Sequence, residues 1–371
     1  LFEDEEQTLW VGTTSGGLNS FSVGNFMTFG APEGLAGDAA HAVMQDRRGT
    51  VWVATLHGLT AIQPDGAKQS YTLTEGLSSL RVQALAESAD GSILVGTFRG
   101  LDRWRDGRIE RVVSDGSLPF TSITAIVEDR RGEWWLGTAA GLYRVAEGRA
   151  TRIDGINDGA VTSLLLDRQG DVLIGVRYRG LLRAHEGIVT PEAIEGLSHT
   201  SVMAMFEDRD GVLWLGTNGG GLNRVVGGVA QVVRERDGLF DDVVYAVTED
   251  RHGRDLWLGS NRGVWRVAKE AIEGFLRGQH THVASSGYGT GDGMRSITVS
   301  GSGQVQPSAW RTTDGRLWFA TIKGVAVIDP SAIRISTARP PVAVESVLAD
   351  GAAIDPAVPV AAGYRNLEFR Y

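Results

Sequence analysis

The strongest constraint on this chain is a sequence unit that recurs about every 40 residues. A full copy at residues 202–224 reads VMAMFEDRDGVLWLGTNGGGLNR. Each copy has a Trp or Leu anchor and then Gly-Thr and Gly-Leu or close variants, and in every copy after the first a turn that ends in Gly precedes the anchor. The anchors are spaced by 42, 42, 41, 38, 41, 43 and 61 residues, and they are Trp10, Trp52, Leu94, Trp135, Leu173, Trp214, Trp257 and Trp318. Self-similarity of this period is typical of solenoids and of propeller blades.

Each unit has the composition of short strands. Residues 123–127 and 161–166 are rich in β-branched and other apolar residues, and Asp and Gly turns follow them. Apolar residues do not recur at the helical spacing of three and four. In the copy around Trp135 the predicted strands are 123–128, 134–137, 141–145 and 150–153. Four strands per unit, repeated radially, make a β-propeller, so we predict an all-β fold.

The number of blades is open between seven and eight. We favour seven, with the first copy belonging to a preceding propeller, because Leu1 begins in the middle of a unit. The natural N-terminus is therefore expected upstream. The propeller is expected to extend over residues 1–335. The long gap before Trp318 contains an insertion, in which we predict a helix at 269–276.

The pattern changes after Pro330. Pro340 and Pro341 resemble a linker, and residues 358–371 alternate in the manner of strands. We therefore predict that residues 336–371 hold a linker and the beginning of a β-sandwich domain.

The acidic pairs within the units are predicted to be structural. Glu128 and Asp129 precede a turn and two tryptophans, but the same arrangement recurs along the chain, and a catalytic pair would not. The Asp can bond its own turn, and the Trp can pack between sheets. Between units, Gly-Leu or a variant marks the chain crossing to the next blade, and its apolar residue is expected to fill the gap between blades.

Composition excludes several classes of function. The formal net charge is −9, which argues against nucleic acid as the main partner. There is no cysteine, and there is no apolar run long enough to span a membrane. His280 and His282 could face the same way on a strand, but no third ligand stands at an obvious spacing. We predict no metal, no cofactor and no catalytic residue.

The units resemble the two-component regulator propeller repeats of bacterial sensor proteins. Residues 202–224 carry the resemblance, and residues 292–296 and 314–330 resemble the closing blade of that family. The copies at Leu94 and Leu173 depart from the pattern by lacking Trp, and Val176 and Ser260 replace Thr.

The resemblance implies the extracytoplasmic sensor region of a membrane-anchored regulator. It would lie on the periplasmic or extracellular side of the inner membrane, and the membrane segment would be outside this sequence. An immunoglobulin-like domain would follow Pro340 and Pro341 and lead to a histidine kinase or diguanylate cyclase. A homodimer through the following domains is implied as well.

A ligand is expected to contact the positions that do not repeat. The turns between Gly-Thr and Gly-Leu lie on the same face as the crossings, and they gather arginines and a lysine that would focus an anion there. We predict a small-molecule ligand with a carboxylate or another anionic group, for instance an acidic saccharide. The predicted contacts are His57, Phe98, Arg99, Arg177, Tyr178, Arg179, Asn218, Arg262 and Lys323. The alternative is that these arginines are solvated or paired with Asp158, Asp241 or Asp242.

Two other functions stay open beside the non-catalytic sensor. A propeller glycoside hydrolase would need two unrepeated carboxylates across a sugar, which Asp158, Asp241 and Asp242 could supply, and a lyase is possible on the fold alone. A propeller that binds another protein would use the same face. Cleavage of a saccharide would distinguish the enzyme from the sensor.

Overall fold

The computed structural model describes residues 1–3, 9–14, 17–21, 24–119, 121–156, 159–299, 305–333, 346–354 and 366–370. The chain divides into two compact units. The larger comprises Ser22–Ile333, and the smaller comprises Leu1–Phe21 and Arg334–Tyr371. No helix in the described part of the chain is long and apolar enough to cross a membrane.

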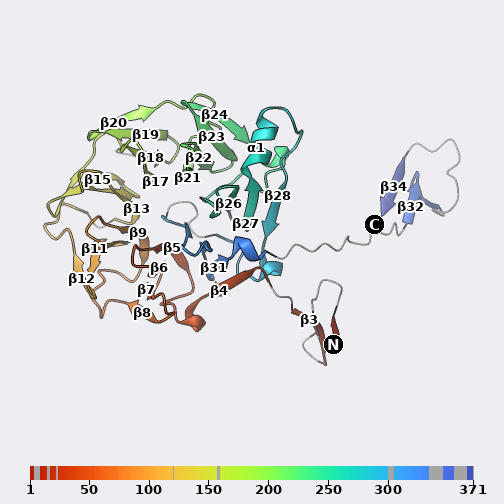
Figure 1. Cartoon of the computed structure of the whole chain (residues 1–371), viewed down its shortest axis with the longest axis horizontal. Helices are drawn as coiled ribbons and strands as arrows, with labels where there is room; N and C mark the ends of the chain where they lie inside the picture. Colours follow the sequence, from red (N-terminus) through yellow and green to blue (C-terminus); the bar gives the residue numbers. More distant parts are fainter. Residues whose placement is uncertain are drawn as a thin grey trace. The chain divides into compact units, whose positions relative to one another are not determined.

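The larger unit is a propeller of seven blades, each a four-stranded antiparallel sheet (Figure 1). Blade 1 contains β5 (Ala40–Gln45), β6 (Val51–Thr55), β7 (Gly58–Ile62) and β8 (Lys68–Tyr71). Blade 2 contains β9 (Val82–Glu87), β10 (Ile93–Thr97), β11 (Gly100–Arg105) and β12 (Arg108–Arg111). Blade 3 contains β13 (Ile123–Glu128), β14 (Trp134–Thr138), β15 (Gly141–Ala146) and β16 (Arg149–Arg152).

The next three blades repeat this order. Blade 4 contains β17 (Val161–Leu166), β18 (Val172–Val176), β19 (Gly180–His185) and β20 (Ile188–Glu192). Blade 5 contains β21 (Val202–Glu207), β22 (Leu213–Thr217), β23 (Leu222–Val226) and β24 (Val229–Val233). Blade 6 contains β25 (Ala246–Glu249), β26 (Asp255–Gly259), β27 (Val264–Ala268) and β28 (Ser285–Tyr288). The predicted fold class and the four strands around Trp135 are confirmed.

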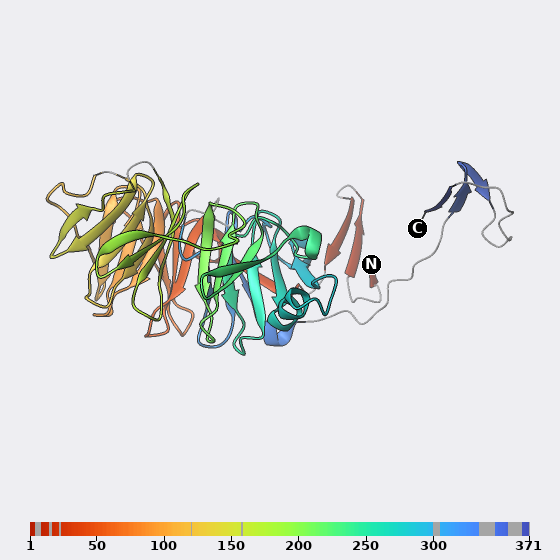
Figure 2. The same cartoon turned by 90° about the horizontal axis from the view of Figure 1, so that it is seen from above.

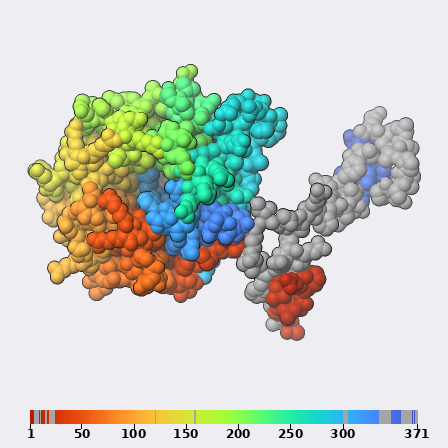
Figure 3. All heavy atoms as spheres, in the orientation of Figure 1, coloured from red at the N-terminus to blue at the C-terminus, as the bar shows by residue number. Residues whose placement is uncertain are grey.

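Blade 7 closes the ring with strands from both ends of the unit. It combines β29 (Ala309–Arg311), β30 (Leu317–Thr321) and β31 (Gly324–Ile328) with β4 (Phe26–Phe29) as its fourth strand. Phe26 is paired with Ile328, and Phe29 with Val325. In the space-filling view the blue atoms of blade 7 therefore lie against the orange atoms of blade 1 (Figure 3).

The first strands contact one another around the ring and line its centre. Because consecutive strands are antiparallel, the turns fall at two opposite ends of each blade, as the side view shows (Figure 2). We call the end with the first-to-second strand turns the hairpin face. The other end, with the second-to-third strand turns and the crossings between blades, is the crossing face.

The repeated Asp and Trp form one structural unit on the hairpin face. The indole Nε1 of Trp52, Trp135 and Trp214 donates to the second oxygen of an Asp six residues earlier, at 2.8, 2.9 and 2.9 Å. The other oxygen of the same Asp accepts turn amides; Asp129, for example, accepts from Arg131 and Glu133. The acidic residue thus fixes the turn and satisfies a buried indole.

Within the ring, the glycine of the Gly-Thr pair gives space to the next blade. A Cβ on Gly96 would lie 2.8 Å from a side-chain carbon of Ile123, and one on Gly137 would lie 2.7 Å from Val161. The crossings end in buried apolar residues, which fill the gaps between blades: Leu35, Leu77, Ile156, Leu239 and Met294. Three crossings contain short 3-10 helices, η1 (Ala31–Glu33), η2 (Glu235–Asp237) and η3 (Thr290–Asp292), and η4 (Pro330–Ala332) follows β31.

A segment before β29 passes through the centre of the ring. Gln306 donates its amide to the Thr124 carbonyl, accepts from the Leu85 amide, and receives the Leu164 amide on its side-chain oxygen. The Pro307 carbonyl accepts from Val43, and the Ser308 hydroxyl donates to the Tyr245 carbonyl. Residues 306–308 therefore bond the innermost parts of five other blades, so the channel is crossed by protein.

The insertion in blade 6 contains the predicted helix, α1 (Lys269–Leu276). His280 and His282 lie in the loop between α1 and β28, not on a strand, so the suggested common strand face for two imidazoles was wrong.

The smaller unit contains two three-stranded sheets. One is β1 (Phe2–Glu3), β2 (Leu9–Thr13) and β3 (Gly17–Phe21), and it includes the anchor Trp10, which is therefore not part of the seven-bladed ring. The other has the order β33-β32-β34, formed by β33 (Ala352–Ile354), β32 (Ser346–Ala349) and β34 (Leu367–Arg370). Pro340 and Pro341 lie outside the described residues, and the immunoglobulin-like domain stays a prediction.

Candidate functional site

A buried threonine positions the turn residues on the crossing face. The Thr55 hydroxyl donates to the Gly58 carbonyl at 3.0 Å and accepts the His57 amide at 3.1 Å. Thr97 makes the same bonds to Gly100 and Arg99. The turn is thereby fixed from below, and the residues after the threonine project from the blade.

Blade 4 departs from this pattern because Val176 replaces the threonine. Its turn is one residue longer, and Tyr178 has a φ of +60°. The Tyr178 amide donates to the Ser201 hydroxyl at 3.1 Å. The Tyr178 side chain is 69% exposed. The turn of blade 4 therefore has three residues, 177–179, where blades 1 and 2 have two.

The structure places all nine predicted residues in second-to-third strand turns on the crossing face. They come from six blades: His57 from blade 1, Phe98 and Arg99 from blade 2, Arg177, Tyr178 and Arg179 from blade 4, Asn218 from blade 5, Arg262 from blade 6 and Lys323 from blade 7. Blade 3 contributes only Ala139 and Ala140 at these positions.

Some of these side chains already have partners in the protein. Arg262 bonds Glu235 at 2.9 Å and lies 5.2 Å from the Phe240 ring centre. Arg179 donates to the Gly155 carbonyl at 2.8 Å. The alternative named Asp158, Asp241 and Asp242 as partners of the arginines, whereas Arg262 pairs with Glu235. Asp242 instead accepts the Glu235 amide, and Asp158 lies outside the described residues.

The remaining basic side chains face solvent. Arg99 and Lys323 are exposed and Arg177 is half-buried, and within the described residues no side-chain hydrogen bond is present for any of the three. They share the crossing face with exposed apolar residues. Phe98 is 46% exposed and Tyr178 is 69% exposed.

Sequence reasoning missed Arg81, which belongs to the same surface. Its guanidinium lies 4.7 Å from the centre of the Phe98 ring, and its carbonyl accepts the Phe98 amide at 3.0 Å. Arg81 ends the crossing into blade 2, and crossings also contain unrepeated positions. Arg81 would have been found if the unrepeated positions of the crossings had also been treated as candidate ligand contacts.

The hairpin face uses its charged residues between blades. Glu87, Glu128 and Glu207 each accept a turn amide of the preceding blade, at 3.0, 2.7 and 2.9 Å. Arginines in the same turns also donate to the next blade, and Arg168, for example, donates to the Arg209 carbonyl at 2.6 Å. Both members of the acidic pair Glu128 and Asp129 are therefore occupied by structural bonds.

A cavity of about 640 Å³ opens at the centre of the hairpin face. Its floor includes Gln306 and Pro307, and none of the nine predicted residues lines it. The wall is mainly apolar, with Met44, Ile126, Leu164, Met205, Phe206 and Trp310. The charged groups at its edge take part in the bonds between blades.

Comparison with known families bears on the identity of these blades. The model of the family described as two component regulator propeller matches residues 117–140, 196–219 and 238–262. Three segments of the chain therefore match the two-component regulator propeller repeat. The predicted resemblance is thereby confirmed. Among curated protein sequences none matches this chain.

Solved structures share the fold of this propeller. The extracellular domain of a putative hybrid two-component system from B. thetaiotaomicron is 20% identical with a TM-score of 0.74, over 98% of this chain and 49% of that one. This chain thus spans about half of that protein's length. Virginiamycin B lyase from Staphylococcus aureus is 14% identical with a TM-score of 0.60, covering 82% and 98% of the two chains. PorZ of Porphyromonas gingivalis is 15% identical with a TM-score of 0.60, covering 84% and 48%. At these identities the likeness establishes the fold alone.

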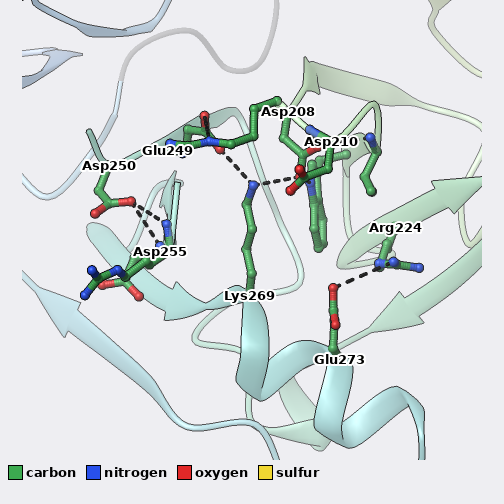
Figure 4. Close-up of polar contacts among 12 residues, drawn as sticks. Asp208, Asp210, Arg224, Glu249, Asp250, Asp255, Lys269 and Glu273 are labelled. Carbon is green, nitrogen blue, oxygen red and sulfur yellow. Dashed lines mark hydrogen bonds and ion pairs between the residues drawn. The ribbon is translucent and has the colours of Figure 1, made fainter. Parts of the chain in front are cut away.

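The propeller also contains a buried ionic cluster at the start of α1 (Figure 4). Lys269 Nζ lies 2.7 Å from Asp208 of blade 5 and 2.7 Å from Glu249 of blade 6. Burial acts to raise the pKa of Asp208, but hydrogen bonds from Lys269 and Trp214 outweigh it and hold that pKa below its ordinary value. The cluster joins two blades and the helix, and its three charged groups satisfy one another.

Proposed function

We propose that this propeller is the ligand-binding part of a bacterial sensor and has no catalytic activity of its own. One observation carries the proposal. On the crossing face, exposed basic and aromatic side chains occupy turn positions that differ from blade to blade, although the blades themselves repeat. Charged and aromatic residues at such positions are not required by the blade, and they suit recognition of a ligand.

The chemistry of these side chains favours a ligand with an anionic group and a flat or apolar part. Arg99, Arg177 and Lys323 supply positive charge, and a guanidinium matches a carboxylate with two parallel hydrogen bonds. Phe98 and Tyr178 offer exposed rings for stacking. An acidic saccharide has both features, and we propose this class for the ligand.

The proposed setting is the extracytoplasmic side of the inner membrane, in a membrane-anchored homodimer. The supporting comparison is with extracellular domains of putative two-component systems. Ligand binding would favour one arrangement of the domain that follows the propeller, and so change the activity of a histidine kinase or diguanylate cyclase. The size of that response is limited by the difference in ligand affinity between the two arrangements.

A thermal-shift and calorimetric screen tests the proposal. Acidic and neutral mono- and oligosaccharides are added to the wild type and to the double variant Arg177→Ala/Arg179→Ala. A ligand at one hundred times its Kd stabilises the folded protein by about 2.7 kcal/mol. We expect an acidic saccharide to bind the wild type, to be recovered unchanged, and to lose most of its affinity for the variant.

A matched control removes the same charge elsewhere. Arg108→Ala/Arg149→Ala changes two exposed arginines on outer strands of blades 2 and 3, and it should leave binding intact. Equal loss of binding in both double variants would show a net-charge effect and contradict a site on the crossing face. Cleavage of the saccharide would instead establish an enzyme, and absence of any small-molecule ligand would favour a protein partner.

A further inference from the structure

Three blades have a buried polar side chain at the same position of the third strand. Thr60, Asp102 and Asn223 are each paired with the residue that follows the anchor of their blade. Each accepts a backbone amide from the crossing into its own blade: Ala36 at 2.9 Å, Ser78 at 2.8 Å and Ser198 at 3.0 Å. This position therefore holds the crossing against the blade.

Both polar atoms of the Asn223 side chain are hydrogen-bonded at that position. Its Oδ1 accepts the Ser198 amide, and its Nδ2 donates to the Ser198 hydroxyl at 2.8 Å and to the Leu215 carbonyl at 3.4 Å. The site in blade 5 thus requires one acceptor atom and one donor atom from the same planar group.

Asp102 occupies the same position in blade 2 with a carboxyl group. Its Oδ2 takes the acceptor role, whereas its Oδ1 is buried and has no hydrogen-bond partner, and the residue is 0% exposed. The Ser78 hydroxyl lies 2.9 Å from the Thr97 hydroxyl, which itself donates to the Gly100 carbonyl. The Thr97 hydroxyl is the hydrogen-bond partner of the Ser78 hydroxyl, and Asp102 Oδ1 has no hydrogen bond in the described structure.

An ionised Asp102 does not suit this environment, because a carboxylate can only accept hydrogen bonds. A buried charged oxygen without a donor is costly, whereas a protonated carboxyl is neutral, as the Asn223 amide is at the same position in blade 5. Burial raises the pKa of Asp102 above its ordinary value, although the Ser78 hydrogen bonds and Arg111 act in the opposite direction.

The charged groups around Asp102 are few. The neighbouring strand β10 has no ionisable residue, and β12 places Arg111 opposite Asp102, with its guanidinium on the Arg99 carbonyl at 2.7 Å. The crossing that Asp102 holds contains Glu75, which accepts from Thr72, and Arg81, which lies over Phe98.

We propose that Asp102 is protonated in the folded protein and acts as a pH-dependent latch for the blade 2 part of the crossing face. The neutral carboxyl holds the crossing at Ser78, and the chain continues from there to Arg81, which bonds and covers Phe98. When Asp102 loses its proton, the carboxylate requires water, and the equilibrium shifts toward arrangements in which the crossing has moved away. The control of ligand binding by this latch rests on the proposed function, whereas the protonation itself does not.

Equilibrium unfolding across pH tests the protonation. Below the unfolded-state pKa both states hold the proton, and Asp102→Asn should match the wild type in pH dependence. As the pH rises toward the folded-state pKa, the unfolded wild type releases a proton that the folded state retains, so the wild type loses stability relative to the variant. The ratio of their unfolding constants should change by up to tenfold per pH unit in this window and then become constant.

Asn223→Asp is the matched reverse change. It places a carboxyl at the same position in blade 5, and it should introduce a pH dependence of the same sign. Infrared difference spectra between the wild type and Asp102→Asn provide a readout that does not depend on stability, because the C=O stretch of a protonated carboxyl should be present only in the wild type. An ionised carboxylate signal for Asp102 at pH 5, or a ratio of unfolding constants that does not change with pH, would overturn the proposal.

Hydrogen exchange then tests the latch. The protection of the Ser78 and Phe98 amides, relative to the same amides in Asp102→Asn, should fall as the pH rises. If Asp102 titrates as described but these amides keep equal protection in both proteins, the latch is wrong. A failed saccharide screen would leave all of these measurements unaffected, so the two proposals fail separately.

Discussion

The hairpin face and the crossing face are made by the same repeats, but they use charged side chains differently. On the hairpin face Glu128, Arg168 and their counterparts bond the backbone of the adjacent blade. On the crossing face, the basic residues Arg99, Arg177 and Lys323 do not recur at the equivalent position of every blade. The charged side chains that recur on the hairpin face join neighbouring blades. Those on the crossing face that do not recur are available to a ligand.

The largest effect is expected at the buried cluster between blades 5 and 6. Lys269→Met leaves the carboxylates of Asp208 and Glu249 buried without their shared cation, and it should cost about 3–5 kcal/mol of unfolding free energy, measured by denaturant titration. The loss should diminish at low pH. The lowered pKa of Asp208 contributes stability above the unfolded-state pKa, and that contribution disappears as the pH falls through the folded-state pKa.

Glu273→Gln is the control on the same helix. Its carboxylate is 3.8 Å from Arg224 and 37% exposed, so the change should cost less than about 1 kcal/mol. Equal losses for the two variants would mean that the Lys269 cluster contributes no more than a surface ion pair.

The second effect concerns the bond between a turn and its tryptophan. Asp129→Ala removes the acceptor of Trp135 Nε1 and of two turn amides, so it should cost about 1–3 kcal/mol. The measurement is again denaturant unfolding. Asp210→Ala in the corresponding turn of blade 5 removes an exposed carboxylate with no side-chain bond among the described residues, and it should stay within about 0.5 kcal/mol.

A smaller effect is expected for one bond between blades. Arg168→Ala removes a 2.6 Å hydrogen bond to the Arg209 carbonyl, and it should cost about 0.5–1.5 kcal/mol. Chemical unfolding of this variant beside Arg108→Ala, which changes an exposed arginine on β12, measures the contribution of the bond. Unchanged stability would mean that the arginines of the hairpin face do not stabilise the contact between blades.

The smallest effect on stability is expected on the crossing face. Arg177→Ala/Arg179→Ala should change the unfolding free energy by about 1 kcal/mol or less, because one side chain lacks a hydrogen bond in the described structure and the other bonds a single carbonyl. A loss of several kcal/mol in a thermal or chemical melt would contradict the comparison between the two faces, since these arginines would then be structural.

Repetition explains why so much of the fold could be predicted. Each blade has the same strand pattern, so the strands around Trp135 could be predicted from it. The helix at Lys269–Leu276 lies in an insertion and was predicted from its own local sequence. The Asp–Trp bond was missed, although a signal existed. Asp46, Asp129 and Asp208 each stand six residues before a tryptophan.

Other features had no local signal. Gln306 bonds three blades that lie far from it in sequence, and its surrounding residues match no repeat. Lys269 stands at the start of a helix, where a lysine is usually exposed. It is buried because blades 5 and 6 pack around it, which the local sequence does not indicate. Asp102 stands where other blades have Thr60 or Tyr143, so sequence alone gave no reason to separate it from a variable position. The ligand contacts remain a prediction, because solvent-facing side chains are determined by the ligand and not by the fold.

The closure of blade 7 has a consequence for synthesis of the chain. Phe29 on β4 pairs with Val325 on β31, which is 296 residues later (325 − 29). At about 5–20 residues per second, β4 would wait roughly 15–60 s after its synthesis before its partner strand exists. During that time both edges of the growing ring are open, and each is able to pair with another chain. A nascent chain that stops at any earlier blade boundary leaves β4 without β31, so removal of whole blades from the C-terminal end prevents this closure.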